Sequence, residues 1–352
     1  MLLSLLPISN LVAASLIQAD YKSWTMSLEM IVLDASMHCW FVLALLVWLA
    51  SFIWACHDIC FNCYKDLLTF ILQRFEKYPN FKSRDLYLDG PSYARHFIHS
   101  FANSLLDYSI KQSNSFKFNI KRLALGNPLL HNKLDTFAIY DFFWSRGMIN
   151  INFHQQILKE CNGIDKDYHS HNAIKWSESC QQAMDKAKMA AFIVSSINVA
   201  KARRFDVLRD PCDKKWETLL RRKSGLKYSD ANKDIGMLSA LKKDADKDID
   251  ILPALKKILQ QSIPITIFSG DQDAIVPTVG NLNHVNKLAK DMNLNMTKDE
   301  AWNHENKSGG WMYSYDNLLN FMTVRRTNHP ATFSKPSETL FIFTSIILNP
   351  SH

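Results

Sequence analysis

The stretch from residue 85 to residue 95 constrains the fold more than any other part of the chain. It reads Asp-Leu-Tyr-Leu-Asp-Gly-Pro-Ser-Tyr-Ala-Arg, so a short apolar run leads into Gly90 and, two residues later, Ser92. The apolar run is typical of a buried strand, and residues 93–108 carry an apolar face at helical spacing. A strand, a tight turn with a serine at its tip and then a helix form the layout of a nucleophile elbow. The alternative interpretation is a plain strand-to-helix loop in which Ser92 caps the helix.

Strands that alternate with helices make up most of the chain after residue 64. The composition is that of an ordinary globular protein, with 47% apolar and 21% charged residues. Short apolar runs predict strands at Leu86–Leu88, Ile120–Leu125, Ile263–Phe268 and Asn317–Val324. The pattern predicts an α/β fold with a mostly parallel sheet and helices on both of its faces.

Three polar residues follow three of these strands in an informative order. Ser92, Asp273 and His329 come as serine, acid and histidine, which is the chain order of the catalytic triad in α/β-hydrolases. In that chemistry His329 would accept the proton of Ser92, and Asp273 would orient the imidazole and stabilise its charged form. We interpret the nearby Asp271 as an acceptor for backbone N–H groups of its loop. The alternative for His329 is an ordinary loop histidine.

Longer segments around these residues resemble plant serine carboxypeptidases and their acyltransferase relatives. The similar segments are EKYPNFKSRDLY at 76–87, GPSYARHF at 90–97, FKFNIKRLALGNPLL at 116–130, FFWSRGMI at 142–149, the strand and acid loop at 262–280, and RRTNHP at 325–330. The resemblance extends from Lys65 to near Asn349, with a gap around residues 230–257.

The resemblance implies a fold, an activity and a set of residues. It predicts one α/β-hydrolase-type domain over residues 64–349, with a helical lid insertion at about 155–223. It implies release of C-terminal residues from peptides through an acyl-enzyme on Ser92, with Asp273 and His329 completing the triad. Tyr93 would contact substrate and supply a backbone N–H to the oxyanion hole. No cofactor and no metal is expected. Two alternatives stay open, an acyltransferase that acts on acyl esters and a catalytically inactive remnant.

The chain also departs from the family pattern. Pro91 replaces a glutamate that binds the substrate's C-terminal carboxylate, and Arg95 replaces a glycine at the start of the helix. The first third of the family's sequence has no counterpart here, so the first strands of the sheet are expected to be missing. That third also carries an oxyanion donor, whose loss typically lowers turnover by about 10²–10³. We therefore expect the strand before Ser92 to present an unpaired edge.

Residues 1–63 form an apolar N-terminal segment without a family match. The uncharged run from Cys39 to Cys56 is just long enough to span a bilayer. It predicts either a membrane anchor or the apolar part of a signal sequence. Cys56, Cys60 and Cys63 have a spacing found in some metal and iron–sulfur sites, which we interpret as coincidence.

Cysteines and glycosylation sequons indicate the compartment. By position in the resembled family, Cys180 and Cys212 are expected to form a disulfide, which would leave Cys161 without a partner. Asn295 and Asn306 begin Asn-x-Ser/Thr sequons, which matter only in the secretory pathway. We therefore predict a vacuolar or extracellular glycoprotein, or a membrane-anchored one if the run at 39–56 is retained.

The sequence also contains a tandem repeat, which predicts neither a repeat fold nor a calcium site. Residues 230–243 and 244–257 are tandem copies, but two copies do not make a solenoid, and neither copy has the glycine and glutamate of an EF-hand loop.

The net charge of +7 is spread along the chain without a dense basic block, so no nucleic-acid partner is expected. A peptide or acyl ester is the expected substrate, and the oligomeric state is left open.

Overall fold

The structure is a computed structural model that describes residues 12–14, 30–32, 41–42, 63–92, 95–111, 116–161, 176–194 and 250–344. The described strands are β1 Val12–Ala14, β2 Met30–Val32, β3 Phe41–Val42, β4 Asp85–Pro91, β5 Asn119–Gly126, β6 Ile265–Gly270, β7 Met296–His304, β8 Lys307–Tyr315 and β9 Leu319–Val324. The described helices are α2 Cys63–Lys77, η3 Pro79–Phe81, α3 Arg95–Lys111, α4 Asn132–Ser145, α5 Ile151–Glu160, α6 Glu178–Val194, α9 Leu252–Gln260, α10 Thr278–Asp291, α11 Ala331–Ser334 and α12 Pro336–Phe341.

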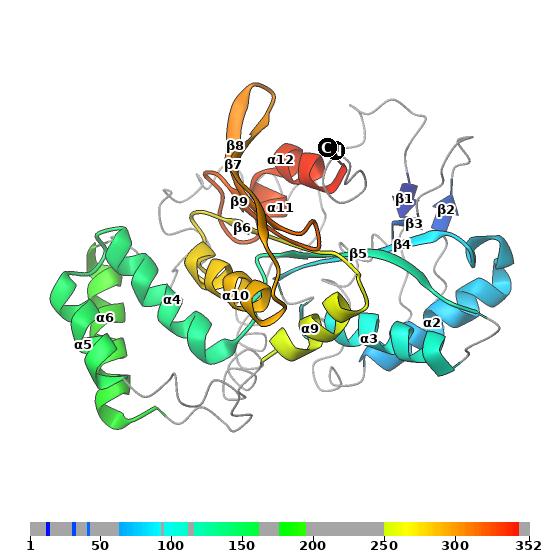
Figure 1. Ribbon diagram of the computed structural model, residues 1–352. Helices are drawn as coiled ribbons and strands as arrows, with labels where there is room; N and C mark the ends of the chain where they lie inside the picture. The colour runs from blue at the N-terminus through cyan, green and yellow to red at the C-terminus, as the bar shows by residue number, and fades with distance from the viewer. Residues whose placement is uncertain are drawn as a thin grey trace, which may run out of the picture.

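A mixed sheet forms the centre of the molecule (Figure 1). Within the described residues its strand order is β3-β4-β5-β6-β9-β8-β7. The first five of these strands are parallel to one another, and β8 and β7 continue the sheet as an antiparallel hairpin. Parallel strands end at the same edge of a sheet, so the loops after β4, β6 and β9 meet there.

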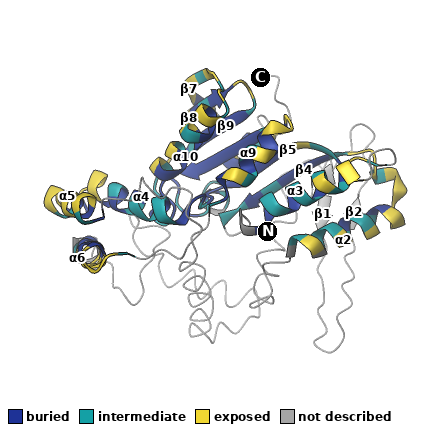
Figure 2. Ribbon diagram, turned by 60° about the horizontal axis from the view of Figure 1, so that its bottom comes forward, coloured by how far each residue is buried: buried dark blue, intermediate teal, exposed yellow. Residues whose placement is uncertain are grey.

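Helices cover both faces of the sheet, as the sequence predicts. The largest apolar core lies between the sheet and α2, α3, α9 and α10, while α11 and α12 cover part of the other face (Figure 1). In α9 the buried residues recur at helical spacing, at Leu252, Leu255, Ile258 and Leu259. Every residue of β6 is buried, which explains its largely apolar sequence. Figure 2 shows the central strands of the sheet mostly in the dark blue of buried residues.

The predicted strands agree with the structure to within a few residues. They correspond to β4, β5, β6 and β9. The hairpin of β7 and β8 has no counterpart in the prediction, because most of β7 is exposed and so carries little apolar pattern. Residues 230–249 of the tandem copies lie outside the described residues. The end of the second copy contributes the start of α9 to the core.

The outer edge of β4 is paired with another strand over part of its length. Phe41 and Val42, inside the apolar run 39–56, form β3 and pair in parallel with Leu86 and Tyr87. The rest of that run lies outside the described residues, so its assignment as anchor or signal stays a prediction. Among the residues that the structure describes, no helix is long and apolar enough to cross a membrane. The domain limits at 63 and 349 also stay predictions.

The predicted disulfide between Cys180 and Cys212 is wrong. Cys180 is bonded to Cys161 instead, with the two Cα atoms 4.8 Å apart. Cys161 directly follows α5, and Cys180 lies in the first turn of α6. The two helices pack on each other, which brings both cysteines into one buried cluster. The prediction relied on position in the family, which carries no information about how α5 and α6 pack here. Cys212 lies outside the described residues.

Replacing Cys161 by Ser is expected to lower the free energy of unfolding by about 2–3 kcal/mol, because the bridge closes a loop of moderate length. Chemical denaturation of oxidised protein measures this change. Replacing Ser179 by Ala, at an exposed position next to Cys180 in α6, is the matched control and should change stability far less. A peptide map in which Cys180 is linked to Cys212 would contradict the assignment.

Candidate active site

The turn after β4 has the strained backbone that an elbow requires. Ser92 directly follows the strand with a φ of 51°, in the left-handed region that non-glycine residues seldom adopt. Helix α3 begins at Arg95, so strand, serine and helix follow one another as predicted. Such strain is found where a structure must hold one side chain in a fixed position.

Ser92, His329 and Asp273 are joined by two hydrogen bonds. Ser92 Oγ lies 2.6 Å from His329 Nε2, and His329 Nδ1 lies 2.7 Å from Asp273 Oδ2. With the proton on Nδ1, the imidazole donates to the carboxylate and its Nε2 accepts from the serine hydroxyl. Asp273 and His329 are buried, with exposed fractions of 1% and 7%. The structure thus brings together the three residues that follow β4, β6 and β9.

The Asp273 carboxylate has its other hydrogen-bonding positions filled. Its Oδ1 accepts from the backbone N–H groups of Ile275 and Val276 at 2.8 and 2.9 Å. Its Oδ2 accepts from the side-chain amide of Asn127 at 2.8 Å, in addition to the His329 ring. Four donors therefore fix the plane of the carboxylate.

The loops after β6 and β9 are held in close contact. A Cβ atom at Gly270 would overlap the backbone carbonyl of Thr327, so only glycine allows this approach. Asp271 Oδ1 accepts from the backbone N–H of Thr327 at 3.3 Å, so it does bind a loop N–H group, but one in the loop after β9 and not in its own loop. Gln272 donates its backbone N–H to the Thr327 carbonyl at 2.9 Å. These contacts set the distance between Asp273 and His329.

Asn127 is a site residue that the sequence analysis missed. It directly follows β5, is fully buried, and its left-handed φ of 48° suits asparagine. Its amide nitrogen donates to Asp273, and its amide oxygen accepts from the backbone N–H of Ala331 at 3.0 Å. Asn127 thereby links Asp273 by hydrogen bonds to the segment that follows His329. The signal available in the sequence is a Gly-Asn-Pro turn that ends a buried strand.

Replacing Asn127 by Asp is expected to slow the reaction of Ser92 about 10- to 100-fold. The change keeps the size of the side chain and the acceptor for the Ala331 N–H, but it replaces the amide donor of Asp273 by a carboxylate oxygen that repels it, so the acid loses its fixed position. The rate of fluorophosphonate labelling measures this effect. Asn293, an exposed asparagine that is also left-handed, gives the matched control Asn293→Asp. Equal losses in the two variants would contradict a role for Asn127.

Other predicted site features can be placed only in part. Tyr93 lies outside the described residues, so its roles in the oxyanion hole and in substrate contact stay predictions. Asn295 and Asn306 are both exposed, beside and within the β7–β8 hairpin, where a glycan would be accessible. Among the described residues no group of His, Cys, Asp or Glu could hold a metal ion. Cys56 and Cys60 fall outside the described residues.

Comparison with known proteins finds relatives of a single family. A family model described as serine carboxypeptidase matches residues 62–227 and 217–349. Serine carboxypeptidase-like 44 from Arabidopsis thaliana is 36% identical over 319 residues, which cover 81% of this chain and 64% of the relative. Serine carboxypeptidase-like 42 from the same plant is 35% identical, over 80% of this chain and 65% of the relative. The chain thus spans slightly less than two thirds of the length of these relatives.

A solved structure shares the fold. The prohormone-processing carboxypeptidase from Saccharomyces cerevisiae superposes with a TM-score of 0.57 at 18% sequence identity, over 83% of this chain and 67% of that one. The likeness supports an α/β-hydrolase-type arrangement, with a mixed sheet and helices on both faces.

Proposed function

Because the chain belongs to the serine carboxypeptidase family, we propose that it is a serine-type hydrolase that releases C-terminal residues from peptides. The observation that carries the proposal is the continuous hydrogen-bonded chain from Ser92 through His329 to Asp273. Its order along the sequence and its place after three parallel strands are those of an α/β-hydrolase triad.

The proposed reaction has two halves. Ser92 Oγ attacks the carbonyl carbon of the last peptide bond while His329 Nε2 accepts the hydroxyl proton. The tetrahedral intermediate collapses, the C–N bond breaks, and His329 returns the proton to the leaving amino group. Water then attacks the acyl-enzyme, with His329 again acting as the base, and the carboxylic acid leaves Ser92. Asp273 keeps its negative charge throughout and stabilises the imidazolium.

A second candidate rests on Pro91. This residue ends β4 next to Ser92 and has neither a side-chain acid nor an N–H, so it cannot bind a peptide's C-terminal carboxylate as the family's glutamate does. An acyltransferase forms the same acyl-enzyme from an acyl ester and passes the acyl group to an alcohol instead of water. That activity needs no carboxylate capture at position 91.

A fluorophosphonate probe tests the nucleophile, since it phosphonylates only an activated serine. We expect labelling of the folded protein at Ser92 and none in Ser92→Ala. A folded protein that stays unlabelled would identify a non-catalytic remnant. Product analysis with an N-blocked dipeptide, and with an acyl ester plus an alcohol acceptor, then separates peptidase from acyltransferase.

We also propose a location in the secretory pathway, in the extracellular space or the vacuole. The Cys161–Cys180 disulfide supports an oxidising compartment, and the exposed Asn295 and Asn306 support glycosylation. A shift in electrophoretic mobility on glycosidase treatment of protein purified from its natural source is the expected result. No shift, together with reduced thiols at positions 161 and 180, would contradict the assignment.

A further inference from the structure

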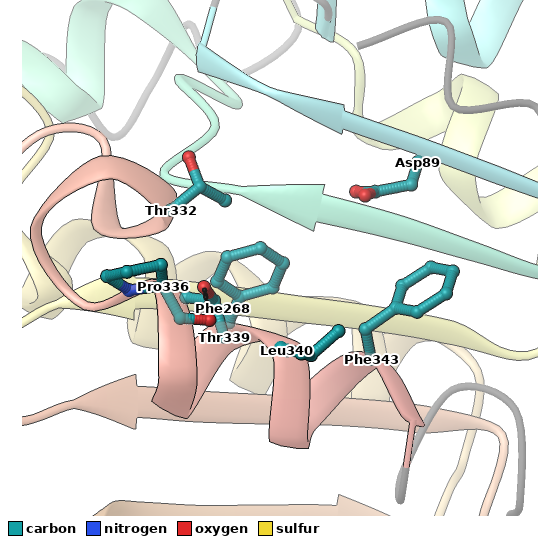
Figure 3. A pocket seen from close by; sticks show the side chains of 7 residues that line it. All are labelled: Asp89, Phe268, Thr332, Pro336, Thr339, Leu340 and Phe343. Carbon is teal, nitrogen blue, oxygen red and sulfur yellow. Dashed lines mark hydrogen bonds between the residues drawn. The ribbon is translucent and has the colours of Figure 1, made fainter. Parts of the chain in front are cut away.

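A cavity of about 200 Å³ lies on the face of the sheet that α11 and α12 cover (Figure 3). Its walls come from β4, β6 and the C-terminal helical segment, and its lining residues are Asp89, Phe268, Thr332, Pro336, Thr339, Leu340 and Phe343. The walls are largely apolar, with the carboxyl group of Asp89 on one side and the rings of Phe268 and Phe343 nearby (Figure 3). The volume is below the range of about 300–1,000 Å³ usual for drug-sized ligands, so only a small molecule fits.

Asp89 is the only carboxylate among the residues that line this cavity, and one of its oxygens is unsatisfied. Its Oδ1 is buried and accepts no hydrogen bond from any described residue. Burial raises the pKa of Asp89 to about 7, and a hydrogen bond from the Gly90 backbone offsets only part of this rise. A buried acceptor without a donor is unfavourable, and a buried charge without a countercharge is more so.

Charged groups on the neighbouring elements have other partners. On β5, Arg122 donates to the Thr266 hydroxyl at 3.2 Å and lies close enough to Tyr87 for the two groups to interact. Lys335, just before α12, and Glu338, within it, pair with each other at 2.6 Å. Neither pair supplies a cation to Asp89, whose pKa is set by burial rather than by a neighbouring charge. The cavity therefore offers one negative site inside an apolar wall.

We propose that this cavity binds a small apolar molecule that carries one protonated amine, with its ammonium group on Asp89 and its body against Phe268 and Phe343. An ammonium group donates to the free carboxylate oxygen and supplies the missing countercharge. The apolar body leaves the water and fills the space between β6 and α12. The site is separate from the proposed triad, although Asp89 lies three residues before Ser92 and Thr332 three residues after His329.

Calorimetric titration of the full chain with benzylamine tests the proposal. We expect saturable binding of one benzylamine, and affinity lower by about 10- to 100-fold for benzyl alcohol, which has the same size and no charge. Benzoate should not bind. The variant Asp89→Asn should lose the preference for the amine over the alcohol. Asp107→Asn, which removes an exposed carboxylate on α3, is the matched control and should bind as the wild type does.

Further measurements separate this site from a general surface effect. Affinity for benzylamine should rise between pH 6 and pH 8 as Asp89 ionises, and binding below pH 7 should release protons. Thr332→Phe, which fills the cavity and leaves Asp89 in place, should abolish binding. Ser92→Ala should bind normally, so failure of the proposed hydrolase activity would not affect the result. Equal binding of amine and alcohol, unchanged binding in Asp89→Asn, or no binding at all would overturn the proposal.

Discussion

Replacing Asp273 by Asn is expected to slow fluorophosphonate labelling of Ser92 by about 10⁴-fold, the loss seen in a serine protease whose triad acid is changed in the same way. The structure predicts which way the new amide will point. The backbone N–H groups of Ile275 and Val276 require an acceptor, so the amide oxygen will take the place of Oδ1. The NH₂ group must then face His329 Nδ1. This fixes the tautomer whose Nε2 carries a proton and cannot accept one from Ser92.

The measurement compares second-order labelling rates at pH 7 with unfolding curves for the same preparations. Asp271→Asn is the matched control, because Asp271 lies in the same loop and accepts from a backbone N–H of the histidine loop. It should change the rate far less than Asp273→Asn. A folded Asp273→Asn protein that labels at the wild-type rate would show that Ser92 and His329 do not depend on this acid.

Replacing Asp89 by Asn is expected to stabilise the protein in neutral and alkaline solution by about 2–4 kcal/mol. Burial raises the pKa of Asp89 from 3.8 to about 7. Between these two values the folded protein keeps a proton that the unfolded chain has lost, so the free energy of unfolding falls as pH rises from about 4 to about 7. Above pH 7 the folded state carries an unpaired buried charge, and the loss of stability is complete.

Urea denaturation at pH 5 and pH 8 checks this prediction. Ionisation of Asp89 should give the wild type a lower free energy of unfolding at pH 8 than at pH 5. In Asp89→Asn the contribution of this ionisation to the difference between the two pH values should be absent. Asp107→Asn serves again as the matched control, because its carboxylate is exposed and pairs with Lys257. If the two variants have the same pH dependence, Asp89 is not the group responsible. Saturating benzylamine should restore stability to the wild type at pH 8.

The features that sequence could predict are those encoded by neighbouring residues. β6 is recognisable because an apolar run fills a strand that is buried on both faces. Ser92, Asp273 and His329 could be ordered because each follows such a run and because long segments around them match a family pattern. The α/β fold class and its helices on both faces follow from the same alternation.

The features that sequence could not predict depend on contacts between distant segments. In β4, Leu86 and Leu88 face the main core, while Tyr87 and Asp89 face the opposite side. This alternation is typical of a strand with one side in water, yet α12, far along the chain, covers Asp89. The contact between Asn127 and Asp273 joins positions 146 residues apart. Likewise, only the packing of α5 on α6 selects Cys161 as the partner of Cys180.

The hydrogen bond between Ser92 and His329 joins positions 237 residues apart in the chain. The strand that carries the serine and the strand that precedes the histidine are not neighbours, since β5 and β6 lie between them. Contacts of such long range form slowly in folding, because the loops between them must close first. During synthesis Ser92 cannot meet His329 until the ribosome has advanced 237 residues beyond the serine. The proposed nucleophile is therefore expected to stay unreactive in the nascent protein and to gain its reactivity only as folding finishes.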